Sequence, residues 1–215
     1  MVPLLLLFLP LAPTLLLVGI IHWFGDIWKL VLFREGVKWR LITLFGIPGV
    51  ILTFLGARLV FRIPEILLSQ ILGIFLILYV LFLFLKPTFK LGEKPLTAIT
   101  GGALSGFFAG VFGVGGAVRA AFLSAFNLPK AVYLATSGAI GLAIDTTRIA
   151  TYITGGTKLS VLLLWGFLLF IPASFLGASI AKGIVTKIPG KKFRFVIAIF
   201  LLLVGIKLLL FPSQP

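Results

Sequence analysis

Long apolar runs, separated by short charged or Gly/Pro-rich stretches, make up most of this sequence. Runs close to the ~20 residues needed to cross a hydrocarbon core predict membrane-spanning helices. We expect six full spans: one ending near residue 33, and others at residues 41–60, 64–85, 129–153, 159–181 and 193–211. The pattern therefore predicts an all-α polytopic membrane protein.

The stretch at residues 101–127 breaks this pattern, since it is apolar but contains seven glycines and Arg119. The predicted helical segments around a break at residues 113–116 are about 24 Å (97–112) and about 17 Å (117–127) long. Both fall short of the roughly 30 Å hydrocarbon core. Non-helical backbone at membrane depth must be buried in protein or line a wet cavity. We therefore predict a Gly-rich helical hairpin at 97–127 with its tip inside the protein, giving 7–8 transmembrane segments.

An internal repeat relates the two halves of the chain. A shift of 119 residues places Pro10, Gly19, Asp26, Lys29 and Gly36 on Pro129, Gly138, Asp145, Arg148 and Gly155. Later in the chain, the sequence FLGA at 54–57 recurs at 175–178. We predict a first repeat at 1–85, a linker at 86–95 and a second repeat at 96–212. The first repeat lacks its glycine hairpin, and its apolar piece at residues 3–9 looks like a remnant of the second arm.

Loop charge predicts that the two repeats have inverted topology. The loop before residue 41 carries Arg34, Lys38 and Arg40, whereas its repeat equivalent carries only Lys158. The opposite bias holds for the next loop, with Arg58 and Arg62 in the first repeat against five basic residues in the second, namely Lys182, Lys187, Lys191, Lys192 and Arg194. Basic loops face the cytoplasm, so equivalent loops are expected on opposite sides of the membrane.

The overall composition narrows the function. The chain has 215 residues, 60% of them hydrophobic, and a mean hydropathy of +1.25, which excludes a soluble globule. Its net charge of +14 is carried mainly by short loops, so positive-inside topology explains it better than nucleic-acid binding. With no cysteine, one histidine and five acidic residues, the sequence offers no plausible metal cluster, and we expect no cofactor. Enzyme motifs are also missing, so an intramembrane enzyme is not expected.

Arg119 and the glycines Gly113, Gly115 and Gly116 predict an anion site. The second half-helix would present free N–H groups and its positive dipole end at the hairpin tip, with Arg119 in its first turn. The alternative is that Arg119 extends to the interface or caps a carbonyl group.

Two further charge pairs lie inside predicted spans: Asp26 with Lys29, and Asp145 with Arg148. At a spacing of three residues, each pair lies on one helical face and can neutralise itself, which is a purely structural explanation. The functional alternative makes Asp145 or Asp26 a coupling residue and Arg148 a second anion contact. His22, one turn before Asp26, is either a hydrogen-bonded core residue or a proton-coupling residue.

The helix at 129–153 is too polar to face lipid on all sides, because it also contains Thr136, Ser137, Thr146, Thr147 and Thr151. We expect it to line the cavity beside the hairpin, with Thr136 and Ser137 near the substrate.

The hairpin and this helix resemble the sulfite exporter TauE/SafE family of membrane permeases. The resemblance rests on the run GFFAGVFGVGG at 106–116, on Val118-Arg119, and on Ala135-Thr136-Ser137. The sequence departs from the family pattern at Ala117, where a third glycine is usual, and at Ala121, where a proline is expected. The resemblance implies a two-repeat membrane protein that carries small sulfur-containing or organic anions.

Together these features predict a secondary transporter for small oxyanions such as sulfite, thiosulfate or sulfonates, working by alternating access. Its partners would be the anion, the lipid bilayer and, to complete the first repeat, a second copy in a homodimer. We expect a multi-pass protein of a cell membrane, most simply a prokaryotic plasma membrane. The alternative from another class is a non-transporting assembly subunit that a partner completes.

Overall fold

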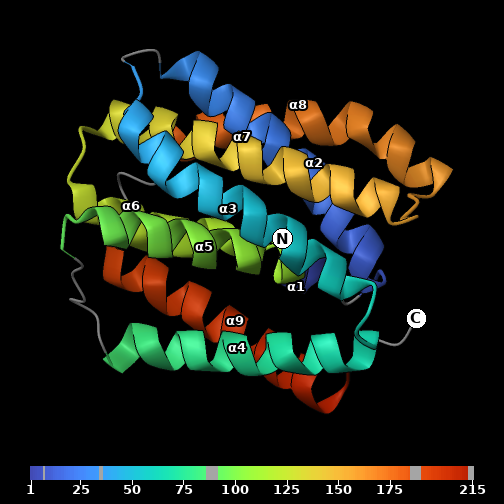
Figure 1. Cartoon of the computed structure of the whole chain (residues 1–215). Helices are drawn as coiled ribbons and strands as arrows, with labels where there is room; N and C mark the ends of the chain where they lie inside the picture. The colour runs from blue at the N-terminus through green and yellow to red at the C-terminus, as the bar shows by residue number, and fades with distance from the viewer. Residues whose placement is uncertain (7, 34–35, 86–91, 185–189, 213–215) are drawn as a thin grey trace.

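Helices account for all the regular structure in the described part of the chain, which comprises residues 1–6, 8–33, 36–85, 92–184 and 190–212 of a computed structural model. The helices are α1 (Val2–Leu5), α2 (Leu11–Leu32), α3 (Trp39–Val60), α4 (Glu65–Leu85), α5 (Pro95–Phe112), α6 (Gly115–Leu123), α7 (Lys130–Thr154), α8 (Val161–Ile184) and α9 (Gly190–Leu210). They form three layers: α2, α7 and α8; then α3, α5 and α6; then α4 and α9 (Figure 1). The all-α class is confirmed.

Four helical segments are long and apolar enough to cross a membrane by length and composition: Leu11–Leu32, Trp39–Val60, Glu65–Phe82 and Pro95–Phe112. Shorter apolar stretches occur at Gly115–Phe126, Val161–Gly177 and Leu201–Leu210. A membrane protein with several spanning helices is thus supported, while the predicted number of six full spans stays a prediction. Residues 86–91 of the predicted linker, together with Arg34 and Lys187, lie outside the described residues.

The glycine hairpin forms where it was predicted, with three corrections to its detail. Gly113 ends α5 in the left-handed conformation (φ 67°), which glycine adopts without steric cost, and α6 begins at Gly115 rather than at residue 117. Arg119 is therefore the fifth residue of α6, just beyond its first turn. The first arm begins at Pro95 and has 18 residues, which is long enough to be counted among the possible spans, contrary to the expectation that it falls short.

Glycines allow α3 and α5 to approach until their backbones touch. A Cβ added at Gly102 would collide with the backbone of Phe45, one at Gly106 with the backbone of Gly49, and one at Gly110 with the backbone around Thr53. The Thr53 hydroxyl also donates to the Gly49 and Gly106 carbonyls, at 2.6 and 3.0 Å. Small residues at this spacing permit tight helix packing in membranes. This contact holds the hairpin against α3.

The helices α2 and α7 lie side by side in opposite directions (Figure 1). Near the end of α2, Lys29 packs over Gly138. A Cβ added at Gly138 would lie 3.0 Å from the Cβ of Lys29. Closer to the middle of α2, Gly19 faces Arg148, whose guanidinium would lie 3.1–3.4 Å from a Cβ added at Gly19. Gly19 and Gly138, like Lys29 and Arg148, are 119 residues apart. Each helix thus presents a glycine to the basic side chain of the other.

The third layer, α4 and α9, packs on the side of the hairpin that faces away from α2 and α7 (Figure 1). Phe75 of α4 stacks on Phe108 and Phe112 of α5, with ring centroids 4.4 and 6.2 Å apart. The buried residues Leu72 and Leu208 join α4 and α9 to the same cluster. At the other end of the stack, α8 contacts mainly α2 and exposes large apolar side chains such as Leu162 and Leu169.

Candidate functional site

A cavity of about 380 Å³ lies between α2, the hairpin tip, α7 and α8. The charged or titratable side chains that line it are His22, Asp26, Lys29, Arg119, Asp145 and Arg148. Gly113, Gly115 and Gly116 line it from the hairpin, and Ser174 lines it from α8. The structure thus places in one cavity eight of the ten residues that the sequence predicted as site residues, together with Lys29.

The Asp26 carboxylate is shared between two helices. Its Oδ1 accepts a 2.6 Å hydrogen bond from Lys29 Nζ on α2, and its Oδ2 lies 3.7 Å from Arg119 Nη2 on α6. Asp26 and Arg119 are only 2% and 7% exposed, whereas the Lys29 side chain is 37% exposed. At 3.7 Å the Arg119 contact is an ion pair but exceeds hydrogen-bond distance. Asp26 therefore belongs mainly to Lys29, and this pairing connects α2 to the hairpin electrostatically.

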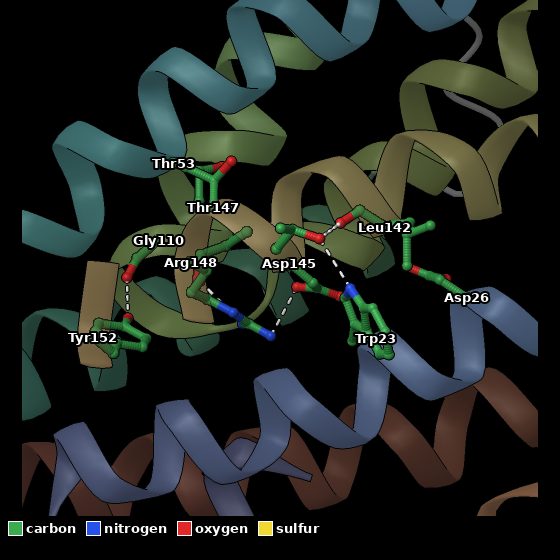
Figure 2. A network of polar contacts seen from close by, with 12 residues as sticks. Trp23, Asp26, Thr53, Gly110, Leu142, Asp145, Thr147, Arg148 and Tyr152 are labelled. Carbon is green, nitrogen blue, oxygen red and sulfur yellow. Dashed lines mark hydrogen bonds and ion pairs between the residues drawn. The ribbon is translucent and has the colours of Figure 1, made fainter. Parts of the chain in front are cut away.

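The second pair, Asp145 with Arg148, is enclosed within α7 and its neighbours (Figure 2). Arg148 Nη2 lies 2.8 Å from Asp145 Oδ1, and Arg148 Nη1 donates to the Ala109 carbonyl at 3.3 Å. The Arg148 residue is 1% exposed. One turn further along α7, the Tyr152 hydroxyl donates to the Gly110 carbonyl. Arg148 and Tyr152 therefore fasten α7 to the end of α5, directly before the hairpin tip.

The hairpin tip owes its shape to two glycines with different roles. A Cβ at Gly113 would lie 2.8 Å from Val2 Cγ2 and 3.1 Å from Arg148 Nη1, so this position is crowded as well as left-handed. A Cβ at Gly115 would collide with Ser105 and Ala109 of α5, and the Ser105 hydroxyl donates to the Gly115 carbonyl at 2.9 Å. Gly116 has nothing within 4 Å of such an atom. Of the three tip glycines, Gly116 is therefore the one with free space for a side chain.

Two predicted residues lie beside the cavity and not in its wall. Ser137 accepts a 3.2 Å hydrogen bond from Arg119 Nε, so it orients the guanidinium from behind. Thr136 accepts a 3.0 Å hydrogen bond from the Lys38 backbone N–H, so it anchors the segment that enters α3.

The other hydroxyls of α7 explain its polarity locally. Thr146, Thr147 and Thr151 each donate to the carbonyl group four residues earlier, at 2.7–2.9 Å. Thr146 also accepts a 2.9 Å hydrogen bond from Trp23 Nε1. A helix with such internally satisfied hydroxyls does not need a wet cavity for them. The face of α7 that does line the cavity carries Ile144, Asp145 and Arg148.

Sequence reasoning missed Gly141, which controls the distance between Asp26 and Arg119. A Cβ at this position would collide with the Asp26 carboxylate and would lie 2.6 Å from Arg119 Nη2. Gly141 lies one turn before Asp145. Because glycines are common in this chain, nothing in the sequence distinguishes Gly141 from the others. Only the crossing of α2 over α7 brings the ends of the Asp26 and Arg119 side chains to this position.

A profile of the family described as Sulfite exporter TauE/SafE matches residues 1–208 of the chain. No curated protein and no solved structure matches it.

Proposed function

Because the chain belongs to the sulfite exporter TauE/SafE family, a family of membrane transporters and not of enzymes, we propose that it is a permease for small oxyanions. Sulfite, thiosulfate and sulfonates form the substrate class, and the plasma membrane of a prokaryote is the location. The cavity between α2, the hairpin tip and α7 is the substrate site.

The main support for this proposal is the environment of Arg119. This residue is a buried cation at a helix hairpin inside the protein, it lines a cavity, and its carboxylate neighbour in the described part of the chain, Asp26, is 3.7 Å away. A charged side chain at membrane depth is costly and usually marks a substrate or ion pathway. Its guanidinium is planar and presents several N–H donors, a geometry that suits the oxygens of a sulfite or sulfonate group.

The arrangement of α2 and α7 supports transport by alternating access. Their reciprocal contacts, Lys29 over Gly138 and Arg148 over Gly19, follow the 119-residue register of the predicted repeat. In transporters built from inverted repeats, the substrate site lies between the repeats, and one repeat rocks against the other. The cavity lies beside this contact, so rocking of α2 against α7 would change its access.

The test is flux of labelled sulfite into liposomes that contain the wild type or the Arg119→Gln variant. Losing a charge-assisted hydrogen bond costs about 1.5–3 kcal/mol, so sulfite affinity should fall roughly tenfold or more. Arg40→Gln is the matched control, because Arg40 is an exposed arginine outside the cavity, and its flux should equal that of the wild type. Unchanged affinity in Arg119→Gln would remove this residue from the site.

A second candidate function is that of a non-transporting subunit completed by a partner, and α8 favours it. Gly56 of α3 packs on the Phe107 carbonyl, whereas its sequence equivalent Gly177 on α8 has nothing within 4 Å. A partner chain, or a second copy in a homodimer, would supply the missing neighbour. This candidate would be supported if the folded protein transports none of the tested anions by itself but transports one of them once a partner is added.

A further inference from the structure

The charged side chains that line the cavity do not balance. Three are cationic, Lys29, Arg119 and Arg148, and two are carboxylates, Asp26 and Asp145. His22 also lines the cavity, but a free imidazole has a pKa of about 6.5 and is mostly neutral at pH 7, so it is counted as neutral. The side chains therefore leave one net positive charge inside the protein.

That surplus charge can be assigned to Arg119. Asp26 is held by Lys29 at 2.6 Å, and Asp145 is held by Arg148 at 2.8 Å. Among the described residues, Arg119 donates a hydrogen bond to the neutral Ser137, and its carboxylate neighbour Asp26 is 3.7 Å away. The guanidinium is thus oriented by a neutral group and lacks a carboxylate within hydrogen-bond distance among the described residues.

Asp26 then limits how much negative charge an incoming anion can carry. An anion bound to Arg119 Nη2 lies close to Asp26 Oδ2, a buried oxygen without a hydrogen-bond partner in the described part of the chain. One negative charge on the anion compensates the surplus charge on Arg119. A second negative charge finds no further basic side chain that is free of a carboxylate among the described residues of the cavity lining, and Asp26 repels it.

We propose that the cavity selects singly charged oxyanions, with Arg119 as the binding cation and Asp26 as the residue that rejects a second negative charge. This rests on the proposed function and specifies its substrate class. Sulfite binds as bisulfite, and sulfonates bind as monoanions. Sulfate, thiosulfate and other doubly charged oxyanions of this size are excluded by charge and not by shape, so this proposal narrows the substrate class to bisulfite and sulfonates.

The experiment measures how unlabelled anions inhibit labelled sulfite flux in liposomes that contain the full chain. Methanesulfonate and sulfamate carry one charge, and sulfate carries two on a tetrahedral sulfur of similar size. In the wild type, both monoanions should reach half-inhibition at a concentration at least tenfold below that of sulfate. In the Asp26→Asn variant, the ratio of the half-inhibition concentration of sulfate to that of the monoanions should fall at least tenfold, because the cavity gains a second net positive charge. Asp26→Glu keeps the charge and should retain the preference for monoanions.

The outcomes separate this proposal from the function on which it rests. Wild-type flux that sulfate inhibits as well as the monoanions do would overturn charge selection while leaving the permease in place. An unchanged ratio in a folded Asp26→Asn protein would also overturn it. If Asp26→Asn does not fold, the wild-type ratio alone decides. Absence of sulfite flux in the wild type would overturn the proposed function itself.

Discussion

The two charge pairs of the cavity have the same sequence spacing but different surroundings. Lys29, in the first pair, has a 37% exposed side chain, and its partner Asp26 also faces Arg119 on another helix. Arg148, in the second pair, has a 1% exposed side chain and also holds the Ala109 carbonyl of α5. The first pair can exchange partners with little rearrangement, and the second cannot. We infer that the first pair serves binding and that the second holds the helices around the site together.

The largest expected effect comes from breaking the enclosed pair with Arg148→Leu. This variant leaves Asp145 buried without its cation and removes the donor to the Ala109 carbonyl. Removing one partner of a buried ion pair typically costs 3–5 kcal/mol, so the free energy of unfolding in detergent should fall by about that amount. The double variant Asp145→Asn/Arg148→Leu should recover part of the loss. A loss below about 1 kcal/mol in the single variant would contradict the structural role that we assign to this pair.

A smaller effect is expected from Gly141→Ala, which disturbs the first pair instead. The added methyl group would collide with the Asp26 carboxylate and with Arg119. Overpacking of this kind typically costs 1–3 kcal/mol, and the loss should appear together with a changed sulfite affinity. Gly25→Ala is the control, since Gly25 also lines the cavity but has nothing within 4 Å of an added Cβ. Equal stability of the two variants would show that Asp26 and Arg119 are not confined by α7.

The smallest effect on stability should come from Lys29→Gln. The lysine side chain is more than one third exposed, and such pairs contribute about 1 kcal/mol or less. Its effect on transport should be larger, because Asp26 without Lys29 turns to Arg119 and removes the free cation. Sulfite affinity measured by flux should therefore fall roughly tenfold, as expected for losing a charge-assisted contact. A variant that is as active as the wild type would indicate that Lys29 does not hold Asp26 away from Arg119.

Local patterns were sufficient to predict the helices and the hairpin. The left-handed Gly113 lies within the predicted break, and α7 and α8 begin within two residues of their predicted starts. Boundaries that depend on a few backbone hydrogen bonds were less certain, which is why α6 begins at Gly115 and Arg119 lies beyond its first turn. The sequence also drew attention to the charged side chains that line the cavity, since charges within apolar helices are rare and costly.

Sequence alone was enough to establish that this chain is helical, that it belongs in a membrane, and that it places two spaced charge pairs in apolar helices and Arg119 in a glycine-rich hairpin. Those properties follow from periodicity, apolar length and the cost of burying charge, all of which act locally. Which of these charges meet depends on the packing of the helices. Asp26 and Arg119 are 93 residues apart in the chain, and they approach because Gly141 leaves room where α2 crosses α7. Helix crossings depend on which small residues face one another across the whole fold, and no local pattern records that.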